Sequence, residues 1–284
     1  MSTLTDNEAR EAAAFDTVAG EVRSSALSTS AWTFRRYREA SAGSPLFRMY
    51  PDLVFEYIGK RIGKDIGTSD KPLNGLKVLD LGAGDGVWSV ILAEQGASVT
   101  SIEISPKQVE LARARMAMHG LKWEARVASA YNLTEDLDQK SFDLVFGQGV
   151  LHHLVMDLNR VAKGIAWVLK PSGIAVFTEP YSGSPFIRAL RERLAFAIPL
   201  DKESPDERPL TESDIQLLAR HFHAVEVAYA DVLAKVGRRM LKSESLTRAL
   251  GIVDRYAVKI QPLRALASLV FLAFAMETHP KGVN

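Results

Sequence analysis

One carboxylate and three glycines alternate between residues 80 and 86, directly after a short apolar run. They are Asp80, Gly82, Gly84 and Gly86, and a second apolar run ends at a lone acid, Glu103. Glycine allows a backbone to turn and to approach a ligand closely, at a cost in conformational entropy. A carboxylate at the end of the second strand can accept hydrogen bonds from ribose hydroxyls. The pattern predicts a turn that grips a nucleoside-containing ligand.

The glycine spacing differs from two common phosphate-binding motifs. In a G-x-G-x-x-G dinucleotide motif, the third glycine would fall at Val87 or Ser89, depending on the register. A P-loop needs a lysine after its glycines, and none follows here. The segment therefore does not fit a pyrophosphate-binding turn.

Strands and helices alternate along the middle of the chain. Expected strands occupy residues 77–82, 98–105, 122–129, 141–148 and 174–180, with helices at 87–96, 105–120 and 157–170. Ser105 and Asp157 are expected to begin two of these helices, and Thr211 with Asp214 forms a capping box for a later one. Late strands are expected at 224–233 and 267–276. This alternation indicates βαβ units and a parallel sheet buried on both faces.

The acid-x-Gly-x-Gly-x-Gly pattern resembles motif I of the class I S-adenosylmethionine (SAM)-dependent methyltransferases. The segments "FGQGVLHHL" and "LKPSG" fit the same resemblance, which covers about residues 76–180 and is nearest to the small-molecule group called type 11. It implies an α/β fold with a Rossmann-like, seven-stranded, mostly parallel sheet, an antiparallel last strand and helices on both faces. We expect an N-terminal helical lid over 1–70 and the methyltransferase domain over 71–284, with an insertion at 181–210 and a helical segment at 235–264.

The resemblance also implies a cofactor site for SAM, with S-adenosyl-L-homocysteine as its product. Ser129 stands where the family has an Asp that accepts from the adenine amine, so this contact departs from the family pattern. The expected cofactor-binding residues are Asp80, Gly82, Ala83, Gly84, Gly86, Glu103, Ile104, Ser129, Ala130, Gln148 and Gly149.

Methyl transfer from a sulfonium is an in-line displacement that needs alignment and exclusion of water. A base is needed only if the acceptor must lose a proton. The strand ends place three candidates for this base at the carboxyl edge of the sheet: His152, His153 and Glu179. The alternative is that the histidines pack or cap a helix and that Glu179 is scaffolding. We expect no catalytic metal site.

The N-terminal segment interleaves aromatic residues with arginines, which suits an apolar substrate with an anionic head. Arg35, Arg36 and Arg48 would hold the head, and Tyr37 or Tyr50 would shield a cation formed during methylation. Tyr57 belongs to the same aromatic set. The plainer reading is that the aromatics form core and the arginines a solvated face.

The sequence is compatible with three functions. The first is C-methylation of a prenyl diphosphate in terpenoid biosynthesis and secondary metabolism, which the resemblance to terpenoid C-methyltransferases suggests and which could bring Mg²⁺ with the diphosphate. The second is O-methylation of a phenol, lipid or sugar hydroxyl with His153 as base. The third is a SAM-binding protein without catalysis.

Composition excludes several partners. The chain has 35 basic and 34 acidic side chains, so nothing indicates a nucleic-acid partner, and it has no cysteine for disulfides or thiolate sites. The most apolar segment, 265–276, is shorter than the ~20 residues of a membrane-spanning helix. The polar N-terminus lacks a signal-peptide pattern. We expect a cytoplasmic monomer or homodimer that acts on a small molecule.

Overall fold

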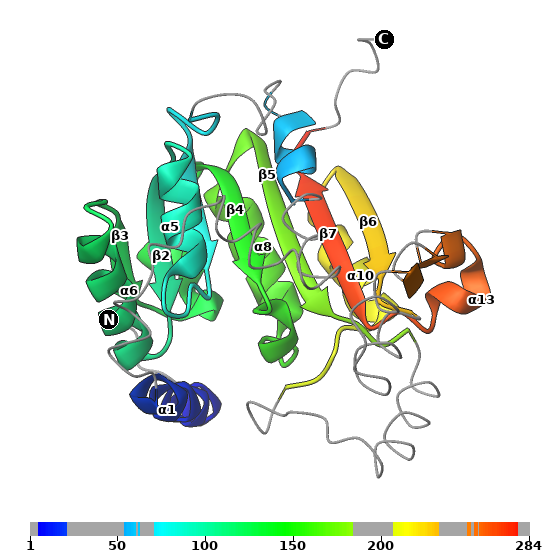
Figure 1. The fold of residues 1–284 in the computed structure, drawn as a ribbon, viewed down its shortest axis with the longest axis horizontal. Helices are drawn as coiled ribbons and strands as arrows, with labels where there is room; N and C mark the ends of the chain where they lie inside the picture. The colour runs from blue at the N-terminus through cyan, green and yellow to red at the C-terminus, as the bar shows by residue number, and fades with distance from the viewer. Residues whose placement is uncertain are drawn as a thin grey trace.

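The computed structural model of the chain describes residues 5–21, 54–60, 62, 71–183, 207–232, 249–250, 253–254 and 256–277. Within them lies one seven-stranded sheet of order β3-β2-β1-β4-β5-β7-β6 (Figure 1). The strands are β1 (Lys77–Leu81), β2 (Ser98–Glu103), β3 (Glu124–Val127), β4 (Phe142–Gln148), β5 (Leu169–Pro180), β6 (Ala224–Ala230) and β7 (Leu269–Ala275). The helices are α1 (Asp6–Glu21), α5 (Val87–Glu94), α6 (Pro106–Met118), η2 (Ala130–Asn132), α7 (Leu133–Asp136), η3 (Leu151–His153), α8 (Leu158–Val168), α10 (Glu212–Ala219) and α13 (Gln261–Arg264).

Strands β1 to β5 pair in parallel, and β7 runs antiparallel to both β5 and β6. The predicted fold class is therefore confirmed, including the antiparallel last strand. The chain leaves β1 toward β2 on one side and later returns to β4 on the other. In open α/β sheets, ligands bind at the carboxyl ends of the strands at such a reversal.

Apolar side chains on both faces of the sheet form two core layers. Phe177 and Val145 face the layer that holds the buried side of α8, whereas Phe146 and Val176 face the layer that holds α5. Neighbouring residues of a strand point to opposite faces, so continuous apolar strands supply both layers. Residues 54–60 form a helical stretch that packs into the second layer.

Local signals placed several helix starts correctly. Ser105 accepts a hydrogen bond from Gln108 N, Asp157 accepts one from Arg160 N, and Thr211 with Asp214 forms a complete capping box. The predicted fifth strand was too short. β5 begins at Leu169 and not at residue 174, because Leu169 pairs with Phe142 across a register shift in β4.

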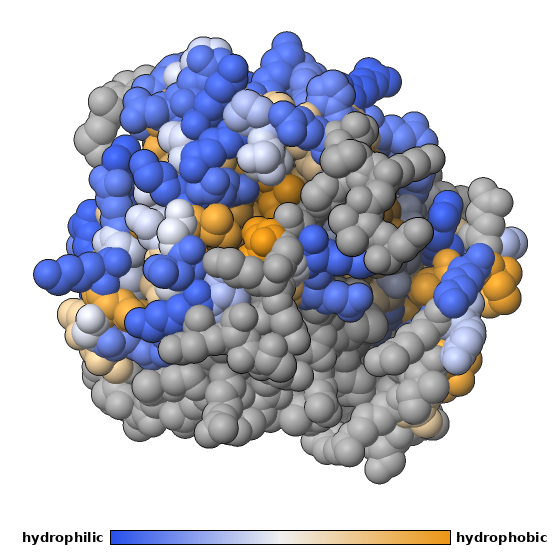
Figure 2. Space-filling model, turned by 90° about the horizontal axis from the view of Figure 1, so that it is seen from above, coloured by the Kyte–Doolittle hydropathy of each residue, from blue (hydrophilic) through white to orange (hydrophobic). Residues whose placement is uncertain are grey.

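The described surface is mostly hydrophilic in the view from above, with apolar residues gathered in smaller areas (Figure 2). None of the helices among the described residues is both long and apolar enough to span a bilayer. α1 lies at one edge of the sheet beside α6, so a helix from the start of the chain reaches the end where a ligand is expected (Figure 1).

Candidate functional site

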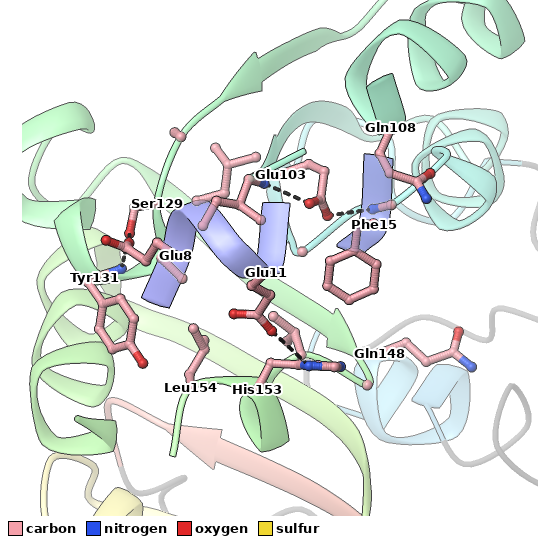
Figure 3. Close-up of a pocket in the computed structure, with 18 of the residues that line it drawn as sticks. Glu8, Glu11, Phe15, Glu103, Gln108, Ser129, Tyr131, Gln148, His153 and Leu154 are labelled. Carbon is pink, nitrogen blue, oxygen red and sulfur yellow. Dashed lines mark hydrogen bonds and ion pairs between the residues drawn. The ribbon is translucent and has the colours of Figure 1, made fainter. Parts of the chain in front are cut away.

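A cavity of about 460 Å³ opens at the carboxyl ends of β1, β2 and β4, within the usual size range for small-molecule sites (Figure 3). Its walls are the turn after β1, the end of β2, the segment after β3 and the segment after β4, and α1 covers one side. The predicted site residues that line it are Gly82, Gly84, Glu103, Ile104, Ser129, Ala130, Gln148, Gly149 and His153. The structure thus joins four separate segments at the strand reversal.

The glycine turn leaves free space at one position. Gly84 has a φ of +53°, and a Cβ added there would meet no protein atom within 4 Å. Gly82 also has positive φ, but a Cβ there would lie 2.5 Å from Val150 Cγ2. Gly82 is therefore required by packing, whereas the space beside Gly84 belongs to the cavity.

Three predicted cofactor residues do not line the cavity. Asp80 is buried beneath the turn and accepts a 2.6 Å hydrogen bond from Ser89 Oγ. Burial raises the pKa of Asp80 to about 7. Ala83 and Gly86 are also absent from the lining, and an added Cβ at Gly86 would lie 2.9 Å from Ala112 Cβ. These residues shape the turn without reaching the cavity.

Glu103 presents its carboxylate to the cavity from the end of β2. Its Oε2 accepts from Gly84 N at 3.0 Å, and its Oε1 accepts from Ile104 N at 2.7 Å and Ser105 N at 2.9 Å. Burial raises the pKa of Glu103, and these backbone donors only partly oppose that effect. Oε2, with one backbone donor, keeps capacity to accept from a ligand hydroxyl.

The segment after β3 meets α1 at the other end of the cavity. Ser129 is buried and accepts from Tyr131 N, which starts η2. Its hydroxyl donates to Glu8 of α1, a carboxylate that is itself 4% exposed (Figure 3). A carboxylate therefore stands beside Ser129, although it comes from a different part of the chain than the family pattern implies.

The sequence analysis predicts a helical lid over residues 1–70 but missed the residues of α1 that line the cavity. Glu8, Glu11 and Phe15 all line the cavity, and Asp16 of the same helix accepts from Ser105 Oγ at 2.5 Å. The spacing 8, 11 and 15 places these three side chains on one helix face. That spacing was the available signal, but it did not show which surface the helix covers.

Glu179 was predicted as a catalytic base, and the structure places it elsewhere. Its side chain is 0% exposed and lies outside the cavity lining. It accepts from the backbone N–H groups of Val150 and Leu151 at 3.0 and 2.9 Å, and it lies 2.9 Å from His152 Nδ1. Glu179 therefore holds the segment after β4 in place, and its oxygens face donors and not a substrate.

His153 is the predicted base that does line the cavity. Its Nδ1 lies 2.8 Å from Glu11 Oε1 and 3.4 Å from Glu207 Oε2, and its ring meets Phe15 edge-on (Figure 3). Burial by itself lowers the pKa of His153, but Glu11, Glu207 and Glu179 outweigh it and raise the pKa above its ordinary value. No described residue forms a hydrogen bond with its Nε2, whereas Nδ1 is buried against Glu11, also without a hydrogen bond.

One grouping of side chains departs from the expectation that no metal site exists. Ligand atoms of His152, His153 and Glu207 all lie within 4.8 Å of one another. Nδ1 of each histidine already faces a carboxylate, Glu179 for the first and Glu11 for the second. We therefore interpret the group as two imidazoles beside carboxylates: His152 forms a hydrogen bond with Glu179, whereas His153 Nδ1 lies against Glu11 without one.

One of the predicted substrate contacts, Tyr57, is described and is not in this site. Tyr57 is buried in the core, where its ring meets Phe271 edge-on with centroids 6.0 Å apart, so it packs there and does not line the cavity. The other predicted residues from the N-terminal segment lie outside the described residues: Arg35, Arg36, Tyr37, Arg48 and Tyr50.

The described lining of the cavity is acidic. It contains the carboxylates of Glu8, Glu11, Asp85 and Glu103, and no lysine or arginine. His153 is the one basic side chain among these described lining residues. Such a cavity favours a cationic ligand over an anionic one.

Comparison with known proteins agrees with this fold. Residues 78–173 match the family described as "Methyltransferase domain". A ubiquinone biosynthesis O-methyltransferase from Pelagibacter ubique is 36% identical over 132 residues, which covers 46% of this chain and 53% of that protein. One from Xylella fastidiosa is 33% identical over 164 residues, covering 56% and 61%. The chain thus spans between half and two thirds of the length of these two relatives.

Solved structures extend the likeness of fold to most of the chain. The geranyl diphosphate C-methyltransferase of Streptomyces coelicolor aligns with a TM-score of 0.56, covering 97% of this chain and 100% of that one. The two are 13% identical, so the match bears on the fold alone.

Proposed function

Because this chain contains a class I SAM-dependent methyltransferase domain, we propose that it methylates a hydroxyl oxygen of a small, largely apolar molecule such as a phenol. The observation that carries this proposal is the position of His153, an imidazole in the wall of the cavity whose Nδ1 lies against Glu11. The names of the relatives, which are O-methyltransferases, support the same reaction class.

The residues of the cavity fit the cofactor. The open space beside Gly84 accommodates a ligand against the backbone, and Glu103 Oε2 suits ribose hydroxyls. The acidic lining suits the sulfonium and ammonium charges. Bound SAM supplies an activated methyl group with a neutral thioether as its leaving group.

The remaining chemistry is a proton transfer. A hydroxyl oxygen is a weak nucleophile until its proton is removed, and a neutral imidazole removes it well near neutral pH. In the proposed reaction, the acceptor oxygen gives its proton to His153 Nε2 while it attacks the methyl carbon. The new oxygen–carbon bond forms as the carbon–sulfur bond breaks, and the bonding pair stays on sulfur.

C-methylation of a prenyl diphosphate has less support. A diphosphate needs cationic partners, and the described lining of the cavity has no lysine or arginine. Arg35, Arg36 and Arg48, which carried that prediction, lie outside the described residues. The O-methylation alternative therefore replaces terpenoid methylation as the main reading, and it requires no diphosphate-bound Mg²⁺.

The test is transfer of labelled methyl from SAM to a panel of phenols, hydroxylated lipids and prenyl diphosphates, with products located by mass spectrometry. We expect label on oxygen, and His153→Ala to lower kcat by about 10²- to 10⁴-fold with SAM affinity retained. His221→Ala is the control, because His221 bonds Asn159 and does not line the cavity. Label on a prenyl carbon would refute the proposal. SAM binding without turnover would instead favour a non-catalytic SAM-binding protein.

A further inference from the structure

α1 joins two parts of the site that are far apart in the sequence. One turn of the helix supplies Glu8, which accepts from Ser129 after β3, and the next supplies Glu11, which lies against His153 after β4 (Figure 3). Asp16, further along, accepts from Ser105 Oγ and Lys107 N at the start of α6. A single helix therefore contacts the walls at both ends of the cavity.

The carboxylate of Glu11 lies close enough to Nδ1 of His153 to favour a proton on that nitrogen, although the two atoms are not aligned as a hydrogen bond. A neutral imidazole has one N–H and one nitrogen with a free lone pair. Nδ1 lies 2.8 Å from Glu11 Oε1 and 3.4 Å from Glu207 Oε2, and two carboxylates favour an N–H at this nitrogen. The lone pair is then on Nε2, where a base must have it to accept a proton from a ligand in the cavity.

The His153 ring is also fixed in orientation by its neighbours. Phe15 of α1 meets it edge-on with ring centroids 5.3 Å apart, and the ring centroid of His152 lies 3.9 Å away. His152 is in turn held by the buried Glu179. The face of α1 thus supplies two of the contacts that orient the ring.

We propose that Glu11, supported by Glu207, is a positioning residue for His153. In this proposal, the packing of α1 over the cofactor cavity brings Glu11 to His153 and so orients the catalytic base. This inference rests on the proposed function, because it assigns a role to His153 in proton transfer. In this proposal, the same contact of α1 has two results: it covers the cofactor cavity and it orients His153.

The charges around His153 predict how this arrangement responds to pH. The groups that face it are Glu11 from α1, Glu207 before α10, and Glu179 from β5 through His152. These carboxylates raise the pKa of His153, so the neutral, basic form prevails only above that raised value. Activity should rise as pH rises through it, and removal of one carboxylate should move this rise to lower pH.

Three substitutions of Glu11 distinguish a residue that orients His153 from one that only stabilises the fold. Glu11→Gln keeps an oxygen acceptor but removes the charge, so the acid limb of the kcat profile should move to lower pH. Glu11→Ala should also lower the plateau kcat by about 10-fold or more, as expected when a base loses its orienting partner. Glu11→Asp keeps the charge, so it should restore part of the plateau kcat and part of the original position of the acid limb. Thr17→Ala, on an exposed position of α1, is the control and should leave the profile unchanged.

A measurement independent of turnover completes the test. NMR titration of the His153 imidazole should show a lower pKa in Glu11→Gln than in the unmodified chain, whereas Thr17→Ala should match the unmodified chain. Calorimetry with S-adenosylhomocysteine shows whether each variant still binds in the cavity.

The outcomes distinguish the two proposals. If His153→Ala keeps full turnover, the proposed function fails. If His153→Ala loses turnover while Glu11→Gln and Glu11→Ala keep the unmodified pH profile and titration, only the present inference fails. A stoichiometric divalent metal in the purified protein, lost in Glu207→Gln, would also overturn it, since Nδ1 of His153 would then be a metal ligand.

Discussion

Replacement of Gly84 by alanine tests the cofactor site with a matched control in the same chain. Gly84 and Gly120 have φ values of +53° and +60°, and an added Cβ meets no atom within 4 Å at either. The left-handed conformation costs a non-glycine residue about 1–2 kcal/mol. Both variants should therefore lose similar stability, with melting temperatures lower by several degrees.

Ligand affinity should separate the two variants. The free space beside Gly84 is part of the cavity, whereas Gly120 follows the end of α6 and does not line it. A methyl group forced into the ligand's space at Gly84 should cost about 1–3 kcal/mol, as in an overpacked core. This range corresponds to about 5- to 150-fold weaker binding of SAM. Gly120→Ala should leave the affinity unchanged.

Calorimetric titration with SAM and S-adenosylhomocysteine, beside thermal unfolding of both variants, measures the two effects separately. Equal losses of stability with a selective loss of affinity in Gly84→Ala are the expected result. If Gly84→Ala and Gly120→Ala bind SAM equally well, the turn does not contact the cofactor and the site is wrongly placed.

Three further predictions concern buried and predicted site residues. Burial raises the pKa of Asp80 from 3.8 to about 7, so stability should fall as pH rises between these values, by about 4 kcal/mol at about 1.4 kcal/mol per pH unit. Asp80→Asn should remove that dependence in urea unfolding, and an unchanged slope would contradict the assignment. Glu179→Gln places an amide against backbone donors and should cost about 1–3 kcal/mol of stability, measured by denaturant unfolding. A loss of kcat with stability intact would instead restore its catalytic role. The double variant Arg35→Ala, Arg36→Ala should leave kcat/KM for a hydroxyl acceptor unchanged. A large loss of kcat/KM would again favour an apolar substrate with an anionic head.

Several features of this protein follow from short stretches of sequence. The glycine turn, the acid at the end of β2 and the caps at Ser105 and Asp157 were all predictable, because they depend on backbone sterics and hydrogen bonds within a few residues. The alternation of strands and helices likewise identified the parallel sheet. Because ligands bind at the carboxyl ends of such strands, the alternation also indicated the edge of the sheet at which the ligand site lies.

Only the tertiary structure decided which side chains face that site. Asp80 and Glu179 both stand at strand ends, yet both are turned toward internal donors, Ser89 in one case and the Val150 and Leu151 amides in the other. Glu11 reaches His153 across 142 positions of the chain. Pattern and propensity act over one or two turns, whereas this contact depends on how a whole helix docks, and docking is set by the combined surfaces of elements distant in sequence.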